Sequence, residues 1–190
     1  MDLPIKKVAI VNSGFPFRSR LTHDPCGEVA VVQMKDIDAD SRIDTSQLYR
    51  TSEIKVRSSQ LLEKGDLLFR ARGQTNTVAL FNGQVSPAIA SAPLFHIRAT
   101  GVLPEYLHWF LNLPITQRQL AELAVGTALQ LINKTSFEGF AVSVPSIKIQ
   151  KQIIEIASLS NKELELMRTL AGLKSRRVDT ALLELAKNSH

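Results

Sequence analysis

The sequence contains a single cysteine, Cys26, among 190 residues. One thiol can form neither a disulfide within the chain nor a multi-thiolate zinc site, so a disulfide-stapled scaffold is excluded and a reducing cytoplasm is the expected setting. No apolar run approaches the roughly eighteen residues of a membrane span. The apolar stretch after Lys7 is also too short for a secretory leader, and we expect none. These absences favour a globular protein of the cytoplasm with no membrane partner.

Motifs that carry chemistry are also missing. There is no Gly-rich dinucleotide or triphosphate loop, no Asn/Asp-Pro-Pro-aromatic signature of amino-methyltransferases, and no metal spacing among the four histidines. We therefore expect no catalytic residue, metal or cofactor in this chain. One acidic pattern, Asp40 or Asp44 followed by Glu53-Ile54-Lys55, imitates a nuclease site that holds a divalent cation. About one acidic-x-Lys triplet is expected by chance in this composition, so the nuclease is an alternative hypothesis without further support.

The charge balance favours an anionic partner without identifying it. The chain has 23 Lys and Arg against 18 Asp and Glu, a net charge of +5. The basic excess lies toward the two ends, in residues 1–76 and 148–190. This distribution suits contact with a polyanion such as nucleic acid, although many proteins with other functions are equally basic.

The first hundred residues favour short strands, because apolar residues alternate with period two between turn residues. Strands are predicted at residues 6–12, 28–34, 54–57, 66–71, 77–82, 93–98 and 140–144, with an acidic surface loop at 35–46. Pro104 and Pro114 each suit the first turn of a helix, which predicts a helical pair ending at Gly126. The expected fold is α+β: a β-rich domain with a helical pair at residues 1–146, followed by one long C-terminal helix at residues 147–190.

The C-terminal helix is predicted from residue 149 to about residue 187, where proline is absent and apolar residues recur at helical spacing. A helix of this length spans roughly 58 Å, more than a domain of this size can cover. Part of its apolar stripe must therefore contact another partner, most simply a second copy of the chain. The predicted dimer or partner positions are Ile153, Ile156, Leu159, Leu166, Leu170 and Leu173.

Several segments, taken in order, resemble the specificity subunit of type I restriction-modification systems. The segment Gly14-Phe15-Pro16-Phe17-Arg18-Ser19 is similar to that family's opening turn, and Gly27 to Ile37 resembles the strand that follows. Gly65-Asp66 with its apolar strand and Arg72-Gly73 resembles the family's Gly-Asp turn. Pro104-Glu105-Tyr106-Leu107, Gly126-Thr127-Ala128 and Val144-Pro145 have the order of its second half. The usual subunit is about twice as long, with two target recognition domains and two long helices, whereas this chain has one of each.

The resemblance implies a non-catalytic subunit that recognises double-stranded DNA in a restriction-modification complex. The expected partners are the modification subunit, which brings S-adenosylmethionine, the restriction subunit, and a second copy of the chain. A homodimer about a two-fold axis would place two recognition domains on inverted half-sites. The alternative from another class is a protein-protein interaction module, in which the long helix is a coiled coil and the domain has no role on DNA.

The predicted DNA contacts are basic and amide side chains on expected loops, since these reach phosphates and make paired hydrogen bonds to base edges. They are Arg18, Ser19, Arg20, Lys35, Arg70, Arg72, Gln74, Asn76, Gln130 and Lys134.

Overall fold

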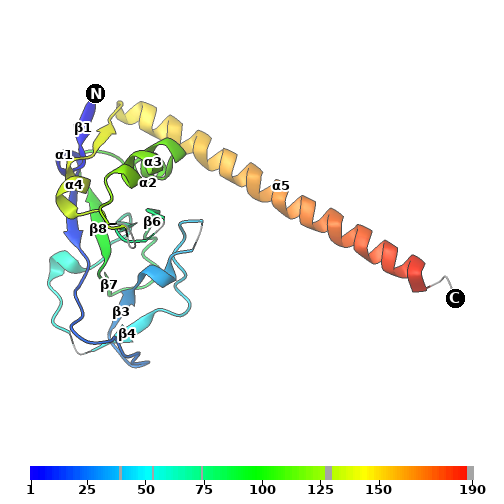
Figure 1. Ribbon diagram of the computed structural model, residues 1–190, viewed down its shortest axis with the longest axis horizontal. Helices are drawn as coiled ribbons and strands as arrows, with labels where there is room; N and C mark the ends of the chain where they lie inside the picture. Colours follow the sequence, from blue (N-terminus) through cyan, green and yellow to red (C-terminus); the bar gives the residue numbers. More distant parts are fainter. Residues whose placement is uncertain (39, 53, 74, 127–129, 188–190) are drawn as a thin grey trace. The chain divides into compact units, whose positions relative to one another are not determined.

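The structure is a computed structural model, and it describes residues 1–38, 40–52, 54–73, 75–126 and 130–187. The chain forms two compact units (Figure 1). The first comprises Met1–Gln150 and contains every strand of the described residues. The second begins at Lys151 and continues the long helix α5 (Ile147–Lys187). The predicted α+β fold with one long C-terminal helix is confirmed.

The first unit is built around a four-stranded antiparallel sheet with the order β2-β8-β5-β6. Its strands are β2 (Ala9–Ser13), β8 (Leu94–Ala99), β5 (Leu67–Arg70) and β6 (Val78–Leu80). In the central strand β5, Leu67, Leu68 and Phe69 are all fully buried. A strand buried on both sides must be apolar at every position, which explains why this segment lacks the alternation of a surface strand.

Two smaller sheets complete the strand content. The three-stranded sheet has the order β4-β3-β7, from β4 (Tyr49–Thr51), β3 (Val29–Val32) and β7 (Ala88–Ala90). In it β3 pairs antiparallel with β4 and parallel with β7. The two-stranded sheet joins β1 (Asp2–Pro4) to β9 (Ala141–Ser143), so the start of the chain lies beside the segment that precedes α5.

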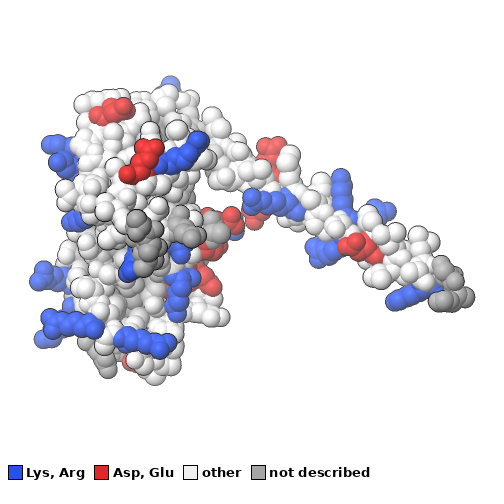
Figure 2. Space-filling model, viewed as in Figure 1, with Lys and Arg blue, Asp and Glu red and all other residues white. Residues whose placement is uncertain are grey.

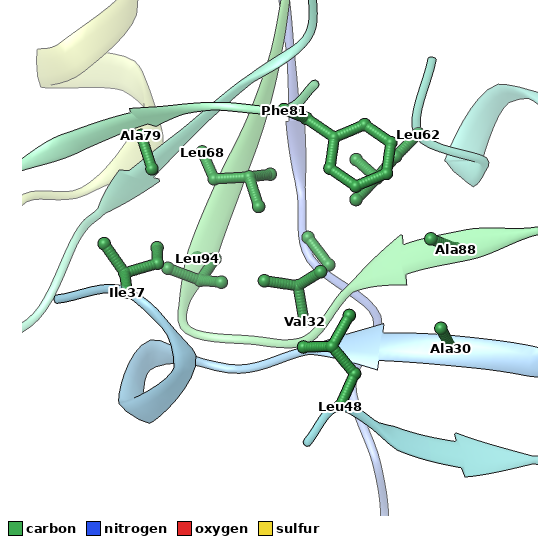
Figure 3. Close-up of a cluster of buried hydrophobic side chains, with 11 residues drawn as sticks. Ala30, Val32, Ile37, Leu48, Leu62, Leu68, Ala79, Phe81, Ala88 and Leu94 are labelled. Carbon is green, nitrogen blue, oxygen red and sulfur yellow. The ribbon is translucent and has the colours of Figure 1, made fainter. Parts of the chain in front are cut away.

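The core between the larger sheets draws on both of them. Leu68, Ala79 and Leu94 of the four-stranded sheet lie with Ala30, Val32, Ala88 and Ala90 of the three-stranded sheet (Figure 3). Loop side chains complete the cluster: Ile37, Leu48, Leu62 and Phe81. Alanines on the smaller sheet let the two layers approach closely while leucine and phenylalanine from the other side fill the space.

Helices cover the opposite face of the four-stranded sheet. α2 (Pro104–Asn112) packs on β6 and β8, and α3 (Pro114–Glu122) follows it. α4 (Lys134–Gly139) packs on β2 and on α1 (Ile5–Val8). The rings of Phe69, Phe95 and Phe137 stack together here, with centroids 4.3 to 5.9 Å apart. Short helical turns at η1 (Met34–Asp36) and η2 (Ser58–Gln60) complete the described elements.

The structure corrects several predicted boundaries. Residues 5–8 are helical, so the first long strand begins at Ala9 instead of residue 6. No strand forms at 54–57, and the strand of this region is β4. β1, β7 and α4 were not predicted from the sequence. These elements are three to six residues long, too short for a period to be recognised, and their positions depend on pairing with distant segments.

Within 35–46, where a surface loop was predicted, η1 begins the segment and a bridge joins Ile37 to Ile43. Ile37 belongs to the core cluster and Ile43 packs against that cluster, so two apolar side chains anchor the acidic loop.

The first turn of α5 belongs to the globular unit. Gln150 is fully buried, its Oε1 accepts the Leu103 N–H at 2.9 Å and its Nε2 donates to the Pro145 carbonyl at 2.9 Å. The compact units accordingly divide four residues beyond the predicted boundary at 146. None of the helices in the described residues combines the length and apolar character needed to cross a bilayer.

Candidate nucleic-acid interface

The predicted DNA contacts come from four separate segments, and the fold joins three of them. The Gly73 N–H donates to the Gln130 carbonyl at 3.1 Å, and the Ile132 N–H donates to the Ala71 carbonyl at 2.9 Å. Arg70 Nη2 reaches the Met34 carbonyl at 3.0 Å. The segments at residues 34–35, 70–73 and 130–132 therefore meet at one end of β5. The fourth segment, the opening turn at 18–20, forms a site of its own.

The opening turn is fixed to the core by its backbone. The Gly14 N–H donates to the Leu94 carbonyl at 2.8 Å and the Phe15 N–H to the Ala90 carbonyl at 2.7 Å. A Cβ on Gly14 would lie 2.5 Å from the carbonyl carbon and oxygen of Ser91. Only glycine fits such a close approach of two backbones, which is the physical reason for a glycine at the start of this turn.

A groove of about 320 Å³ lies along this turn. Phe15 and Phe17, whose rings are 5.0 Å apart, form part of its wall, and Arg18, Ser19 and Arg20 are exposed along it. The other lining residues are Pro16, Leu21, Thr22, Thr51 and Ile54. Neither arginine forms an ion pair among the described residues, so both guanidinium groups are available to an anionic ligand.

Lys35 is exposed and oriented by an aromatic ring. Its Nζ lies 3.7 Å from the ring centroid of Tyr49, a cation–π contact. The ring of His23 also lies beside it, at 5.2 Å between ring centroids. Tyr49 was not among the predicted contacts, because no strand was predicted for its segment. Its place on β4 opposite Val31 holds the ring beside Lys35.

Arg70 and Asn76 are used inside the fold. Asn76 is only 5% exposed, and its Nδ2 donates to the Arg70 carbonyl at 3.0 Å. Arg70 is half-buried, and its Nη2 donates a hydrogen bond to the Met34 carbonyl. Its buried Nε has no hydrogen-bond partner in the described residues. These positions support the loop that follows β5 and give no support to a direct contact between Asn76 and DNA. Gln74 lies outside the described residues.

The remaining predicted contacts on this surface, Arg72, Gln130 and Lys134, differ in exposure and in ion pairing. Arg72 and Gln130 are exposed, and a backbone bridge joins Arg72 to Leu131. Lys134 Nζ lies 3.5 Å from Glu138 one helical turn away, a partly exposed pair that costs little to break. On the face drawn in Figure 2, Lys and Arg side chains gather along the left and lower margins of the globular unit, toward the end that carries β3 and β4.

A buried ionic cluster holds the Gly-Asp turn on the opposite end of β5. Asp66 is 2% exposed; its Oδ2 lies 2.7 Å from both His96 Nε2 and Arg98 Nη2, and its Oδ1 accepts from Arg98 Nε at 2.9 Å. Burial alone would raise the pKa of Asp66, but the hydrogen bonds from Arg98 and His96 outweigh it and lower that pKa to about 2. The sequence predicted this turn from Gly65 but not the anchoring role of its aspartate.

The nuclease alternative finds no support in the described residues. Glu53 lies outside them, and Asp44 accepts hydrogen bonds at one oxygen from the N–H and hydroxyl of Ser46. No group of three His, Cys, Asp or Glu side chains placed to hold a metal ion occurs in the part of the chain that the structure describes.

The predicted partner positions of α5 are mainly solvent-exposed. Ile153 is of intermediate exposure, whereas Ile156, Leu159, Leu166, Leu170 and Leu173 are 53–68% exposed. A shallow hollow along the helix is lined by Leu159, Lys162, Glu163, Leu166, Met167 and Leu170. Apolar side chains exposed in a continuous row indicate a surface that binds another chain.

Comparisons with known structures identify the fold. The chain is similar to the HsdS subunit from Thermoanaerobacter tengcongensis, with 14% identity, a TM-score of 0.68, and coverage of 88% of this chain and 38% of that one. A second similar structure describes complex assembly and conformational transition of the type I R-M system. It matches at 14% sequence identity and a TM-score of 0.70, and the match covers 88% of this chain and 39% of that chain. The S subunit of the type I restriction-modification system from M. genitalium is similar at 14% sequence identity and a TM-score of 0.61. That match covers 90% of this chain and 41% of the M. genitalium chain.

The chain thus spans about two fifths of the length of these similar chains. A search of curated proteins gave no significant match. The profile of the type I restriction modification DNA specificity domain matches residues 12–171, which include the opening turn, the Gly-Asp turn and more than half of α5. The chain therefore belongs to the family of type I restriction modification DNA specificity domains.

Proposed function

We propose that this chain is a sequence-specific DNA-recognition subunit of a type I restriction-modification complex, and that it acts as a homodimer on two inverted half-sites. The observation that carries the proposal is the extent of the family match, from residue 12 to residue 171. This range includes most of the globular unit and more than half of α5. The match therefore supports the family's function for the globular unit and the long helix together, and not for one of them alone.

The content of the chain supports the proposed homodimer. The similar S subunits are more than twice as long, while this chain contributes one globular unit and one long helix. Two copies would restore two recognition units, and two identical chains most often associate about a two-fold axis. The exposed leucines of α5 offer the apolar surface that such a pair would bury.

DNA binding is assigned to the exposed basic side chains of two surfaces. At the opening-turn groove these are Arg18 and Arg20, with Ser19 between them. Beside the end of β5 they are Lys35 and Arg72, with the amide of Gln130 and the partly exposed Lys134. Arginine and lysine on loops bind phosphates without a sequence preference, whereas arginine and amide side chains also read base edges.

The chemistry would come from partner subunits. A modification subunit would supply S-adenosylmethionine and extrude the target base, and a restriction subunit would cleave DNA. This chain would position them on the recognised sequence.

The mass in solution tests the homodimer. We expect about twice 21.0 kDa for the purified chain and a single-chain mass for Leu166→Glu, because a carboxylate in an apolar interface is costly. Asn161→Glu, which is on the other side of the helix, is the control and should leave the dimer intact. A monomeric wild-type chain would overturn the homodimer.

Duplex binding tests the DNA role. The chain, assembled with a type I modification subunit, should bind duplex DNA at low salt and lose affinity steeply as salt rises. If the assembled complex fails to bind any duplex at low salt, the chain is a protein-protein interaction module and the recognition function is wrong.

A further inference from the structure

Three short segments pair side by side just beyond the end of β5. Val125 and Leu131 exchange two backbone hydrogen bonds, from N–H to carbonyl in each direction, at 3.0 and 3.1 Å. Leu131 also forms an antiparallel bridge with Arg72 on its other side. Directly opposed residues of an antiparallel pair point their side chains to the same face. Arg72, Leu131 and Val125 therefore form one row across three segments, which we call the outward row.

The outward row faces solvent, whereas the reverse face of the same segments is buried. Leu131 is 44% exposed, Val125 is 68% exposed, and Arg72 is exposed as well. Ala71 and Ile132, the next residues along two of the segments, point the opposite way and are fully buried. A slip of one residue would expose Ile132, so the pairing determines which side chains face out. Two adjacent apolar side chains held in solvent by a buried reverse face indicate a surface that contacts another molecule.

The cation at one end of the outward row indicates the class of that molecule. Within the described residues Arg72 forms no ion pair. A protein that covered the row would also cover this guanidinium, which is unfavourable unless a carboxylate meets it. The major groove of DNA satisfies both kinds of side chain, because it displays the acceptors O6 and N7 of guanine and the C5-methyl group of thymine.

We infer that the outward row reads base edges in the major groove. Leu131 and Val125 contact the C5-methyl group of thymine, and Arg72 binds O6 and N7 of a neighbouring guanine. The groove admits a two-stranded β-ribbon, and the paired backbones at residues 125 and 131 provide one. This inference rests on the DNA-recognition function proposed above and adds the bases that this surface selects. It also assigns a role to two apolar residues that were not among the predicted contacts.

Uracil tests the apolar contact, because it pairs as thymine does but lacks the methyl group. The chain, assembled with a type I modification subunit, is first used to select its tightest duplex from a random pool. Replacing the thymines of that duplex by uracil, one at a time, should weaken binding about fourfold at one or more positions. In the double variant Val125→Ala/Leu131→Ala the same replacements should have no effect, because the contact is already lost.

Two controls accompany this variant. Ile115→Ala removes an apolar side chain that is 55% exposed on α3, away from the outward row, and should respond to uracil as the wild type does. Binding of the double variant to unrelated duplex at low salt should equal that of the wild type, because phosphate contacts provide it, and this shows that the variant is folded.

The base 7-deazaguanine tests the arginine contact, because it lacks the N7 acceptor. Placed next to a thymine whose methyl group matters, it should weaken binding of the wild type by about tenfold. It should leave Arg72→Ala unaffected, since that variant no longer makes the contact.

Other results would overturn the inference. A selected duplex whose affinity depends on no thymine methyl group would overturn it and leave the DNA role intact. Failure of Val125→Ala/Leu131→Ala to assemble with the modification subunit would also overturn it, because the outward row would then be a protein contact. If the wild-type complex selects no duplex at low salt, the proposed function itself is wrong, and the inference fails with it.

Discussion

The side-chain amide of Asn112 pairs with both backbone groups of Val78. Its Oδ1 accepts the Val78 N–H at 3.1 Å, and its Nδ2 donates to the Val78 carbonyl at 2.8 Å and to the His108 carbonyl at 3.0 Å. Val78 begins β6, the edge strand of the four-stranded sheet. The last residue of α2 thus provides the hydrogen bonds that a further strand would make, and it closes an edge that would otherwise be open to other chains.

We predict that Asn112→Asp lowers the free energy of unfolding by about 2–3 kcal/mol. The carboxylate cannot donate to the carbonyls of Val78 and His108, and it places a charge against their oxygens. Urea denaturation monitored by circular dichroism measures this change. Gln119→Ala, an exposed position on α3, is the control and should change the free energy by less than about 0.5 kcal/mol. Equal effects of the two variants would contradict the edge-closing role.

Asp66 should make stability depend on acid pH. Its pKa in the folded chain is about 2, below the ordinary value of roughly 3.9, because Arg98 and His96 outweigh the cost of burial. A lowered carboxyl pKa stabilises the folded state above the ordinary pKa, and that contribution is lost as the pH falls from about 4 toward 2. We expect the wild type to lose about 2 kcal/mol from this group over that range.

Denaturation of the wild type and Asp66→Asn at a series of pH values measures the effect. The variant should be less stable at pH 7, because Arg98 loses its buried partner, and the gap should narrow below about pH 4. The comparison also removes the contribution of His108, whose pKa burial lowers, since both proteins carry that residue. Asp179→Asn on α5 should leave the pH profile unchanged. A gap that stays constant down to pH 2 would show that Asp66 has an ordinary pKa.

The sequence was sufficient for features with a long or strong local signal. The helix α5 was predicted within two residues at its start, because apolar residues repeat over many turns. The starts of α2 and α3 were predicted at Pro104 and Pro114, since proline suits the first helical turn. Short strands such as β4 and β7 were missed because their pairing partners, rather than their own residues, determine them.

The candidate interface was predictable as segments but not as an arrangement. Arg18 and Arg20 are exposed beside a groove, as a loop position suggests. In contrast, Asn76 is buried, and its side chain donates a hydrogen bond to the Arg70 carbonyl. This contact depends on the turn after β5. Tyr49 had no sequence signal, because its role is to hold the ammonium group of Lys35, which lies fourteen residues earlier in the chain. Residue type indicates what a side chain can bind, whereas only the fold determines which side chains are free to bind it.

Gly14 offers a test of how the opening turn is held. We predict that Gly14→Ala lowers the free energy of unfolding by about 1–3 kcal/mol, because its Cβ would overlap the backbone of Ser91. The displaced turn should also weaken DNA binding through Arg18 and Arg20. Gly139→Ala is the matched control, since a Cβ there has nothing within 4 Å, and it should be neutral or slightly stabilising. Thermal unfolding and duplex binding of both variants in the assembled complex measure the two effects.

The salt dependence of DNA binding separates phosphate contacts from residues that only support the fold. Each phosphate neutralised contributes a slope of about 0.9 in a plot of log affinity against log salt. Arg18→Ala and Arg20→Ala should therefore each reduce the slope by about 0.9 and weaken binding to every duplex to a similar extent. Arg118→Ala, an exposed arginine on α3 outside both candidate surfaces, should leave the slope unchanged.

Asn76→Ala should lower stability but preserve the slope, because the Asn76 side chain is hydrogen-bonded within the domain. An unchanged slope in both opening-turn variants would place the phosphate contacts on another surface, and a reduced slope in Asn76→Ala would show that this side chain is released to meet DNA.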